Sequence, residues 1–99
     1  MIKSIAHDEL AGSTDAVQMP NVPYSWGYIK AAKSNTGNVY VGSSSDVSIL
    51  GTTDAAAMTG FELEPSAVMV VDNLGNLNNL WYISENAGDD LMYFVIVTQ

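Results

Sequence analysis

The stretch KSNTGNVYVG, from Lys33 to Gly42, changes character abruptly in its middle. Its first six residues are of the polar and glycine types that form turns, and Val39 to Val41 are β-branched and aromatic residues that favour strands. We therefore predict a tight hairpin loop at 35–38, with Gly37 at positive φ, that sets the register between strands at 28–33 and 39–41. The role of this loop is predicted to be architectural rather than ligand binding.

The same alternation of turn and strand continues along the chain. Further turn clusters at 64–66, 72–76 and 86–90 separate segments rich in Val, Ile, Tyr, Phe and Trp. A spacing of about ten residues between turns leaves no room for the crossover helices of a parallel sheet. Only 8–17 and 54–58 could each form a helical turn or two, and neither predicts a longer helix. The predicted strands are 24–33, 39–41, 61–64, 67–71, 80–84 and 91–98.

These segments predict an all-β fold, a single antiparallel β-sandwich or small barrel that is jelly-roll-like. The chain has 99 residues, which is enough for one domain with one modest core. Residues 17–99 are expected to form the sandwich and residues 1–16 an extended N-terminal arm. The arm is polar, and its pattern does not predict packing onto the sheet, so we expect it to be mobile in isolation.

The charge of the chain limits its partners. Three lysines face eleven acidic residues, for a net charge of −8, and no basic residue follows Lys33. Binding to nucleic acid or to an anionic membrane needs several basic side chains on one face, so neither is expected. No cysteine, signal peptide or membrane-spanning run is present in the sequence, and we expect a soluble protein made in the cytoplasm. A protein with a basic or apolar patch is the expected partner.

The segment 91–97 is apolar on both of its faces. As a strand it would present either Met92, Phe94 and Ile96 or the alternate set that begins with Leu91 to the outside. One face packs in the core, and the other is covered either by loops of the same chain or by another subunit. The second alternative predicts self-association.

The strand at 24–31 carries a row of aromatic side chains. Tyr24, Trp26 and Tyr28 share one face, and Ile29 and Ala31 share the other. If Ile29 and Ala31 point inward, the aromatic face is a contact surface, because exposed tyrosine and tryptophan supply large buried area at small entropic cost. The opposite orientation, with the aromatics in the core, fits the pattern equally well.

Catalytic and metal-binding patterns are sparse. His7, the only histidine, lies in the predicted arm and has no nucleophile to serve. Glu62 and Glu64 lie side by side on one strand face, which suits a solvated edge rather than a glycosidase pair. The acidic turn at 85–90 and the loop after Asp72 lack the calcium-binding pattern of an EF-hand. We therefore expect no enzymatic activity, no cofactor and no bound metal.

Several motifs occur together in one order. They are Val17-Gln18-Met19-Pro20, Tyr28-Ile29-Lys30-Ala31, Asn35-Thr36-Gly37-Asn38-Val39-Tyr40-Val41-Gly42, Gly60-Phe61-Glu62-Leu63-Glu64-Pro65, Asp72-Asn73-Leu74 and Leu80-Trp81-Tyr82-Ile83-Ser84. With this series the chain resembles small β-rich structural proteins of tailed-bacteriophage virions, over most of its length. It departs from their pattern at Ser66, where glycine is usual, and at 49–59, where an alanine-rich loop is longer.

The resemblance implies a non-enzymatic virion protein on the capsid exterior, of the capsid decoration or cement type. Its partner would be the major capsid protein, and it would itself be a homo-oligomer, with a trimer favoured. A tail or fibre module that binds a host glycan is the alternative, and a small hydrolase is a more distant one. The predicted contact residues are Ile2, Ile5, Leu10, Tyr24, Trp26, Tyr28, Met92, Phe94 and Ile96. Attachment to the capsid is expected to use residues 1–20 together with the aromatic face of the strand at 24–31.

Overall fold

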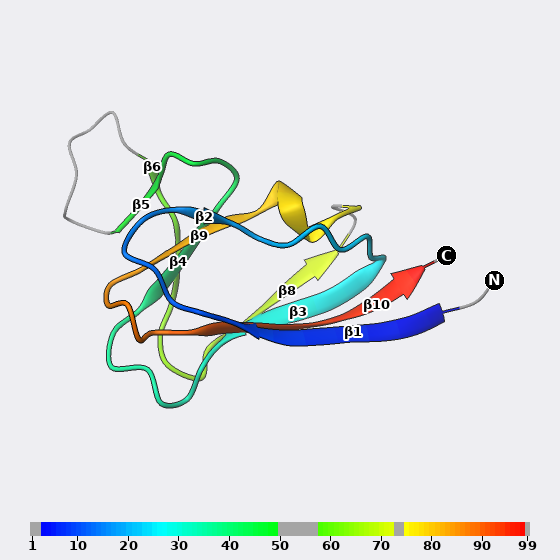
Figure 1. Ribbon diagram of the computed structural model, residues 1–99, viewed down its shortest axis with the longest axis horizontal. Coiled ribbons are helices and arrows are strands. Elements are labelled where there is room, and N and C mark those ends of the chain that lie inside the picture. Colours follow the sequence, from blue (N-terminus) through cyan, green and yellow to red (C-terminus); the bar gives the residue numbers. More distant parts are fainter. Residues whose placement is uncertain (1–2, 50–57, 73–74, 99) are drawn as a thin grey trace.

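The computed structural model describes residues 3–49, 58–72 and 75–98, and it is an all-β structure of two packed antiparallel sheets (Figure 1). Sheet A contains, in spatial order, β1 (Lys3–Leu10), β10 (Leu91–Thr98), β3 (Trp26–Ala31) and β8 (Val68–Asp72). Sheet B contains β2 (Val17–Gln18), β9 (Trp81–Ser84), β4 (Val39–Gly42) and β7 (Phe61–Leu63). A parallel pair, β5 (Val47–Ser48) with β6 (Met58–Thr59), and the 3₁₀ helix η1 (Leu77–Asn79) complete the described elements. The predicted β-sandwich is confirmed.

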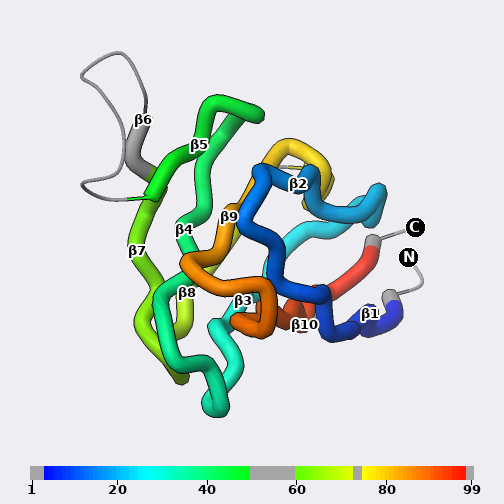
Figure 2. The backbone as a smooth tube through the Cα atoms, turned by 60° about the vertical axis from the view of Figure 1, so that its left-hand side comes forward, coloured from blue at the N-terminus to red at the C-terminus, as the bar shows by residue number. Residues whose placement is uncertain are grey.

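The strands pair from the two ends of the chain toward its middle. β1 pairs with β10, β2 with β9, β3 with β8 and β4 with β7, all antiparallel. The chain is thus a long double strand that is rolled up so that consecutive strands alternate between the sheets, as Figure 2 shows. This is the jelly-roll topology, and it brings the first and last strands side by side.

The core lies between the two sheets. Alternate residues of β3, β4 and β10 point inward and are fully buried, among them Ile29, Val39, Leu91 and Val95. The period-2 pattern of the sequence therefore located these strands to within two residues of their ends. No helix forms at 8–17, and residues 54–57 of the second predicted helical segment lie outside the described residues. None of the described segments forms a helix long and apolar enough to cross a bilayer.

The N-terminal arm was predicted wrongly, because residues 3–10 form the edge strand β1. The strand runs along β10 from the pair Lys3 and Thr98 to the pair Leu10 and Leu91. β10 is central, and its backbone donors and acceptors need partners on both edges. Ala6 and Leu10 pack against the core while polar residues face solvent, which is the ordinary pattern of an edge strand. Residues 1–16 are therefore not a separate arm, and deletion of Met1 to Ser13 would remove part of sheet A.

The predicted hairpin at 35–38 is also wrong. The strand before this turn, β3, lies in sheet A and the strand after it, β4, lies in sheet B, so the turn crosses between sheets. Gly37 does not have a positive φ. It is needed for close approach, because a Cβ atom there would lie 2.8 Å from both the Asn86 amide nitrogen and a carboxylate oxygen of Asp89. The role of the turn is nevertheless structural.

Hydrogen bonds tie this crossing turn to the turn between β9 and β10. The Asp89 carboxylate accepts from the backbone N–H of Thr36 at 2.9 Å and of Gly37 at 3.1 Å, and from the Asn86 amide at 2.8 Å. The Asn35 side chain donates to the Asp90 carbonyl and accepts from the Asp90 N–H, both at 2.8 Å. We call this set of contacts the turn clamp. Asn35 and Asp89 are buried, so these bonds form with limited access of water.

We predict that Gly37→Ala destabilises the protein by about 1–3 kcal/mol, because the added methyl group displaces the turn clamp. Gly88→Ala is the matched control, since nothing lies within 4 Å of a Cβ atom at that position. The control should leave the unfolding free energy unchanged or raise it by up to about 1 kcal/mol. Urea denaturation of both variants measures the difference, and equal stability would refute the close-approach explanation.

The turn between β7 and β8 contains a strained residue. Ser66 has a φ of 74°, the only positive φ of a non-glycine residue in the described ranges. The Ala67 N–H donates to the Glu64 carbonyl at 2.8 Å, and Pro65 occupies the second position, as in a type II turn. The third position of such a turn favours glycine, and here a serine occupies it.

We predict that Ser66→Gly raises the unfolding free energy by up to about 1 kcal/mol, because glycine adopts this φ without the steric cost that a Cβ atom adds. Ser34→Gly serves as the control, since Ser34 is exposed in a turn at negative φ and gains nothing. Thermal and urea denaturation should show a higher unfolding free energy for Ser66→Gly and an unchanged or lower one for Ser34→Gly. A loss of stability in Ser66→Gly would contradict the assignment of strain.

Candidate functional site

The outer face of sheet A is the largest exposed apolar surface that the register defines. Residues paired across antiparallel strands point to the same side, so the face consists of three rows of four residues. The rows are Ile5, Ile96, Trp26 and Asp72; then His7, Phe94, Tyr28 and Val70; then Glu9, Met92, Lys30 and Val68.

Exposure confirms that this face is uncovered. Six large hydrophobic side chains are exposed in the described part of the chain, and five lie here: Ile5 (58%), Trp26 (43%), Val68 (53%), Val70 (60%) and Phe94 (39%). The sixth, Phe61, lies on β7 of sheet B. Contiguous apolar patches on a sheet are a common mark of a contact surface.

Both orientations left open by the sequence are now determined. Ile29 and Ala31 are fully buried, so the aromatic side of β3 points outward. Leu91 and Val95 are fully buried, so β10 presents its other set, which includes Phe94, to the outside. The described elements of the chain leave this side of β10 uncovered.

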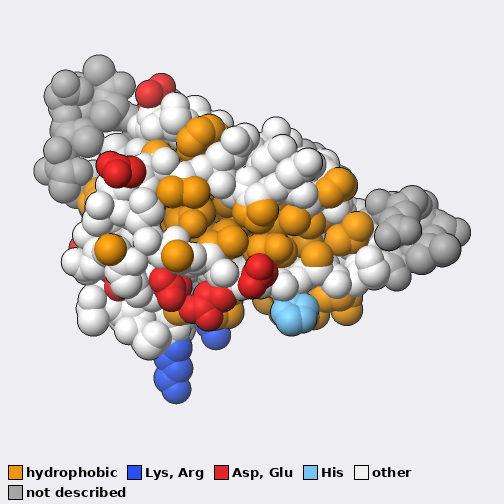
Figure 3. Space-filling model, viewed as in Figure 1, with side chains coloured by type: hydrophobic (Ala, Val, Ile, Leu, Met, Phe, Trp, Pro, Cys, Tyr) orange, Lys and Arg blue, Asp and Glu red, His pale blue; other side chains and the backbone are white. Residues whose placement is uncertain are grey.

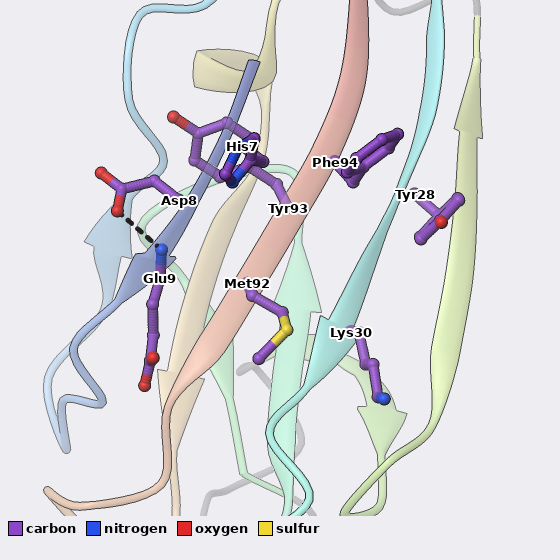
Figure 4. Close-up of a pocket in the computed structure, with 8 residues that line it drawn as sticks. All are labelled: His7, Asp8, Glu9, Tyr28, Lys30, Met92, Tyr93 and Phe94. Carbon is purple, nitrogen blue, oxygen red and sulfur yellow. Dashed lines mark hydrogen bonds between the residues drawn. The ribbon is translucent and has the colours of Figure 1, made fainter. Parts of the chain in front are cut away.

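Three rings form a continuous row across the strands, which we call the aromatic ridge. His7 stacks on Phe94 at a centroid distance of 6.1 Å, and Phe94 stacks on Tyr28 at 5.7 Å. The planes differ by only 24° and 17°, so each ring turns its face to its neighbour and its edge to solvent (Figure 4). Trp26 meets Tyr28 edge to face at 6.1 Å. Both faces of the Phe94 ring are thus occupied by other side chains.

A groove of about 450 Å³ runs beside the ridge (Figure 4). Its lining includes the three ridge residues, with Met92, Lys30 and Glu9 from the next row. A hydrogen bond with Asp90, with the repulsion between the two carboxylates, raises the pKa of Glu9 above its usual value. The groove therefore has an apolar centre, the Lys30 cation on β3, and the Asp8 and Glu9 carboxylates on β1.

The structure brings most of the predicted contact residues together. Ile5, Trp26, Tyr28, Met92, Phe94 and Ile96 share this one face. Leu10 and Tyr24 were assigned wrongly: Leu10 aligns with buried Leu91 and packs on the core, and Tyr24 is itself only 5% exposed. Ile2 lies outside the described residues. His7, Val68 and Val70 were missed as contact residues, since only the strand pairing reveals that they join the same rows.

The acidic and histidine candidates do not assemble into a chemical site. His7 was expected in a mobile arm and instead stacks on Phe94. Glu62 accepts a hydrogen bond from the Tyr40 hydroxyl at 2.9 Å. Within the described ranges, no three histidine, aspartate or glutamate side chains are grouped so that they could hold a metal ion. The Asp89 carboxylate, once considered with Glu85 for calcium, accepts hydrogen bonds of the turn clamp.

A second hydrophobic region is visible on the side of the molecule shown in Figure 3. Hydrophobic side chains form a band across its middle, with acidic side chains below the band and lysine side chains at the lower margin. Seven hydrophobic residues around the core, including Val17, Val22 and Val97, are only partly buried. The hydrophobic side chains of the outer face are the more exposed ones and lie in a regular array, so that face is the better candidate.

Comparison of the chain with protein-family models, with curated proteins and with solved structures finds no match.

We predict that Asp89→Asn lowers the unfolding free energy by about 1–3 kcal/mol at pH 7, because an amide cannot accept hydrogen bonds at both positions. Burial acts to raise the pKa of Asp89, but the hydrogen bonds from Thr36, Asn86 and Gly37 outweigh it and hold the pKa below its usual value. A carboxylate with a lowered folded pKa stabilises above the unfolded value and loses that contribution as the pH falls through the folded value.

The difference between the wild type and Asp89→Asn should therefore be greatest near neutral pH and should narrow below about pH 4. Asp15→Asn, at an exposed position, is the control and should change stability by less than about 0.5 kcal/mol. Urea denaturation between pH 3 and pH 7 provides the measurement. A difference that stays constant over this range would mean that the charge of Asp89 does not contribute.

Proposed function

We propose that the protein is a non-enzymatic structural protein of a tailed-phage virion, of the capsid decoration type, made in the host cytoplasm and bound to the capsid exterior. The observation that supports a binding role is the uncovered outer face of sheet A, with its five exposed hydrophobic side chains and its aromatic ridge. The motif series shared with virion proteins supports the choice of the major capsid protein as partner.

The size and charge of the face suit a contact that is repeated on a lattice. Four strands about 4.8 Å apart and about six residues along each give a face of about 400 Å² in projection, which is half of what a standard interface buries on each partner. Each single contact is then weak. A shell that offers many equivalent positions across neighbouring subunits is stabilised by the sum of these contacts, and each bound copy favours the assembled state by mass action.

A tail or fibre module that binds a host glycan is the second candidate, favoured by the exposed aromatics. Sugars stack on the face of an aromatic ring, and the ridge presents ring edges. The outer side of Tyr28 and the ring of Trp26 are what remains for stacking. The geometry of the ridge therefore supports a protein partner better than a glycan. The hydrolase alternative receives no support from the arrangement of His7, Glu62 and Glu64.

We predict that Phe94→Ser weakens binding to capsid shells that lack the native protein by at least about tenfold, because Phe94 is the centre of the ridge. Phe61→Ser is the matched control: it removes the same side chain from a more exposed position on sheet B. Co-sedimentation with shells measures both. Equal loss in both variants, or none in either, would contradict binding through this face.

The resemblance also implies a homo-oligomer, with a trimer favoured, and this remains a prediction. Light scattering of the purified chain at tens of micromolar tests it.

A glycan array tests the second candidate, and binding of a glycan that Trp26→Ser abolishes would replace the capsid proposal.

A further inference from the structure

We propose that in free solution the outer face of sheet A is covered by a second copy of the chain, in a two-fold pair in which the aromatic ridge of each copy fills the groove of the other. This inference depends on the shape and charge of the face and does not depend on the capsid proposal.

Charge is the first argument for a second copy. The rows of the face hold Lys30, Glu9 and Asp72, and Asp8 also lines the groove, so the face and the groove together carry a net charge of −2, whereas the whole chain carries −8. Most of the excess negative charge thus lies on other surfaces, where two copies repel each other. The outer face is the surface through which two identical acidic chains can approach at the lowest electrostatic cost.

Shape is the second argument. A ridge and a groove lie next to each other on the same face, so the face carries both halves of a complementary pair. A two-fold contact joins identical patches and needs such self-complementarity. A three-fold ring instead joins two different patches. The ridge beside the groove therefore favours a pair over the trimer that the resemblance implies.

The row order determines which side chains meet. The two-fold axis lies between the outer faces of sheet A of the two copies and runs perpendicular to the strands. Each strand then lies opposite the same strand of the other copy, and the order of the rows is reversed. When the ridge enters the opposite groove, the Lys30 row of one copy lies between the Tyr28 row and the Trp26 row of the other. The ammonium group then lies beside the exposed ring of Trp26, where a favourable cation–π contact can form, and the two-fold axis makes this contact occur twice. Met92 enters between Phe94 and Ile96 of the second copy in the same way.

The area shows which class of interface the pair belongs to. Two faces of about 400 Å² bury less than the standard interface, so the pair belongs with weak, transient contacts. We therefore expect a dissociation constant in the micromolar range rather than the nanomolar range. The pair and a capsid contact through this face would exclude each other.

Sedimentation equilibrium of the purified full chain from about 1 μM to about 500 μM tests the pair. The wild type should convert from monomer to dimer across this range, and Phe94→Ser should remain monomeric. Phe61→Ser should associate like the wild type, because Phe61 lies on sheet B. Circular dichroism and the thermal midpoint check that each variant is folded.

A second set of variants tests the arrangement. Lys30→Gln should weaken the pair by about three- to tenfold, Lys30→Arg should restore it, and Lys33→Gln, outside the face, should have no effect. A wild type that is monomeric at 500 μM, a trimer, or association unaffected by Phe94→Ser would each overturn the proposal. Failure of the chain to bind shells, with the pair intact, would count against the capsid function and leave this inference standing.

Discussion

The turn clamp is the constraint on which the rest of the fold depends. A jelly roll consists of crossings, and each crossing must turn the chain from one sheet to the other without exposing or orphaning backbone groups. Asp89 stabilises two of these crossings. It lies in the turn between β9 and β10, and its carboxylate accepts hydrogen bonds from backbone N–H groups of the turn between β3 and β4. Asp90 extends the network to a third crossing by accepting from the Gly12 N–H at 2.9 Å.

The uncovered face of sheet A follows from the size of the chain. β10 is central and apolar on both sides, but the described elements supply one covering layer, and that layer lies on the inner side. A chain of 99 residues cannot bury both faces of a four-stranded sheet. The outer face of sheet A is therefore apolar like a core face, but no second layer of the described chain covers it.

Strand positions could be predicted from the sequence because alternation of inward and outward side chains is a local property. Which face of a strand points into the core could not be predicted for 24–31 and 91–97, because both faces of these segments are apolar. The pairing of strands depends on distant residues, and this explains the two errors. A short turn between two strands resembles a hairpin even where it crosses sheets, and the polar alternation of β1 resembles a mobile segment until β10 is seen beside it. Leu10 and Tyr24 were misplaced for the same reason.

The backbone of Ser66 could not be predicted from the sequence, because a serine after Pro65 does not by itself indicate the positive φ that this residue adopts. The residue thus retains the geometry of the turn at a cost in strain.

Pairing from the two ends inward has a consequence for how the protein is made. β1 leaves the ribosome first, yet its partner β10 is the last described strand, and β3 also pairs with β10. The pairs that β10 makes with β1 and β3 therefore cannot form until β10 has been synthesised, whereas β3 can pair with β8 earlier. Such long-range pairing is slow, because distant segments must meet before any contact stabilises them. During that interval the nascent chain is most exposed to aggregation, and its low content of basic residues and its strong negative charge keep neighbouring chains apart.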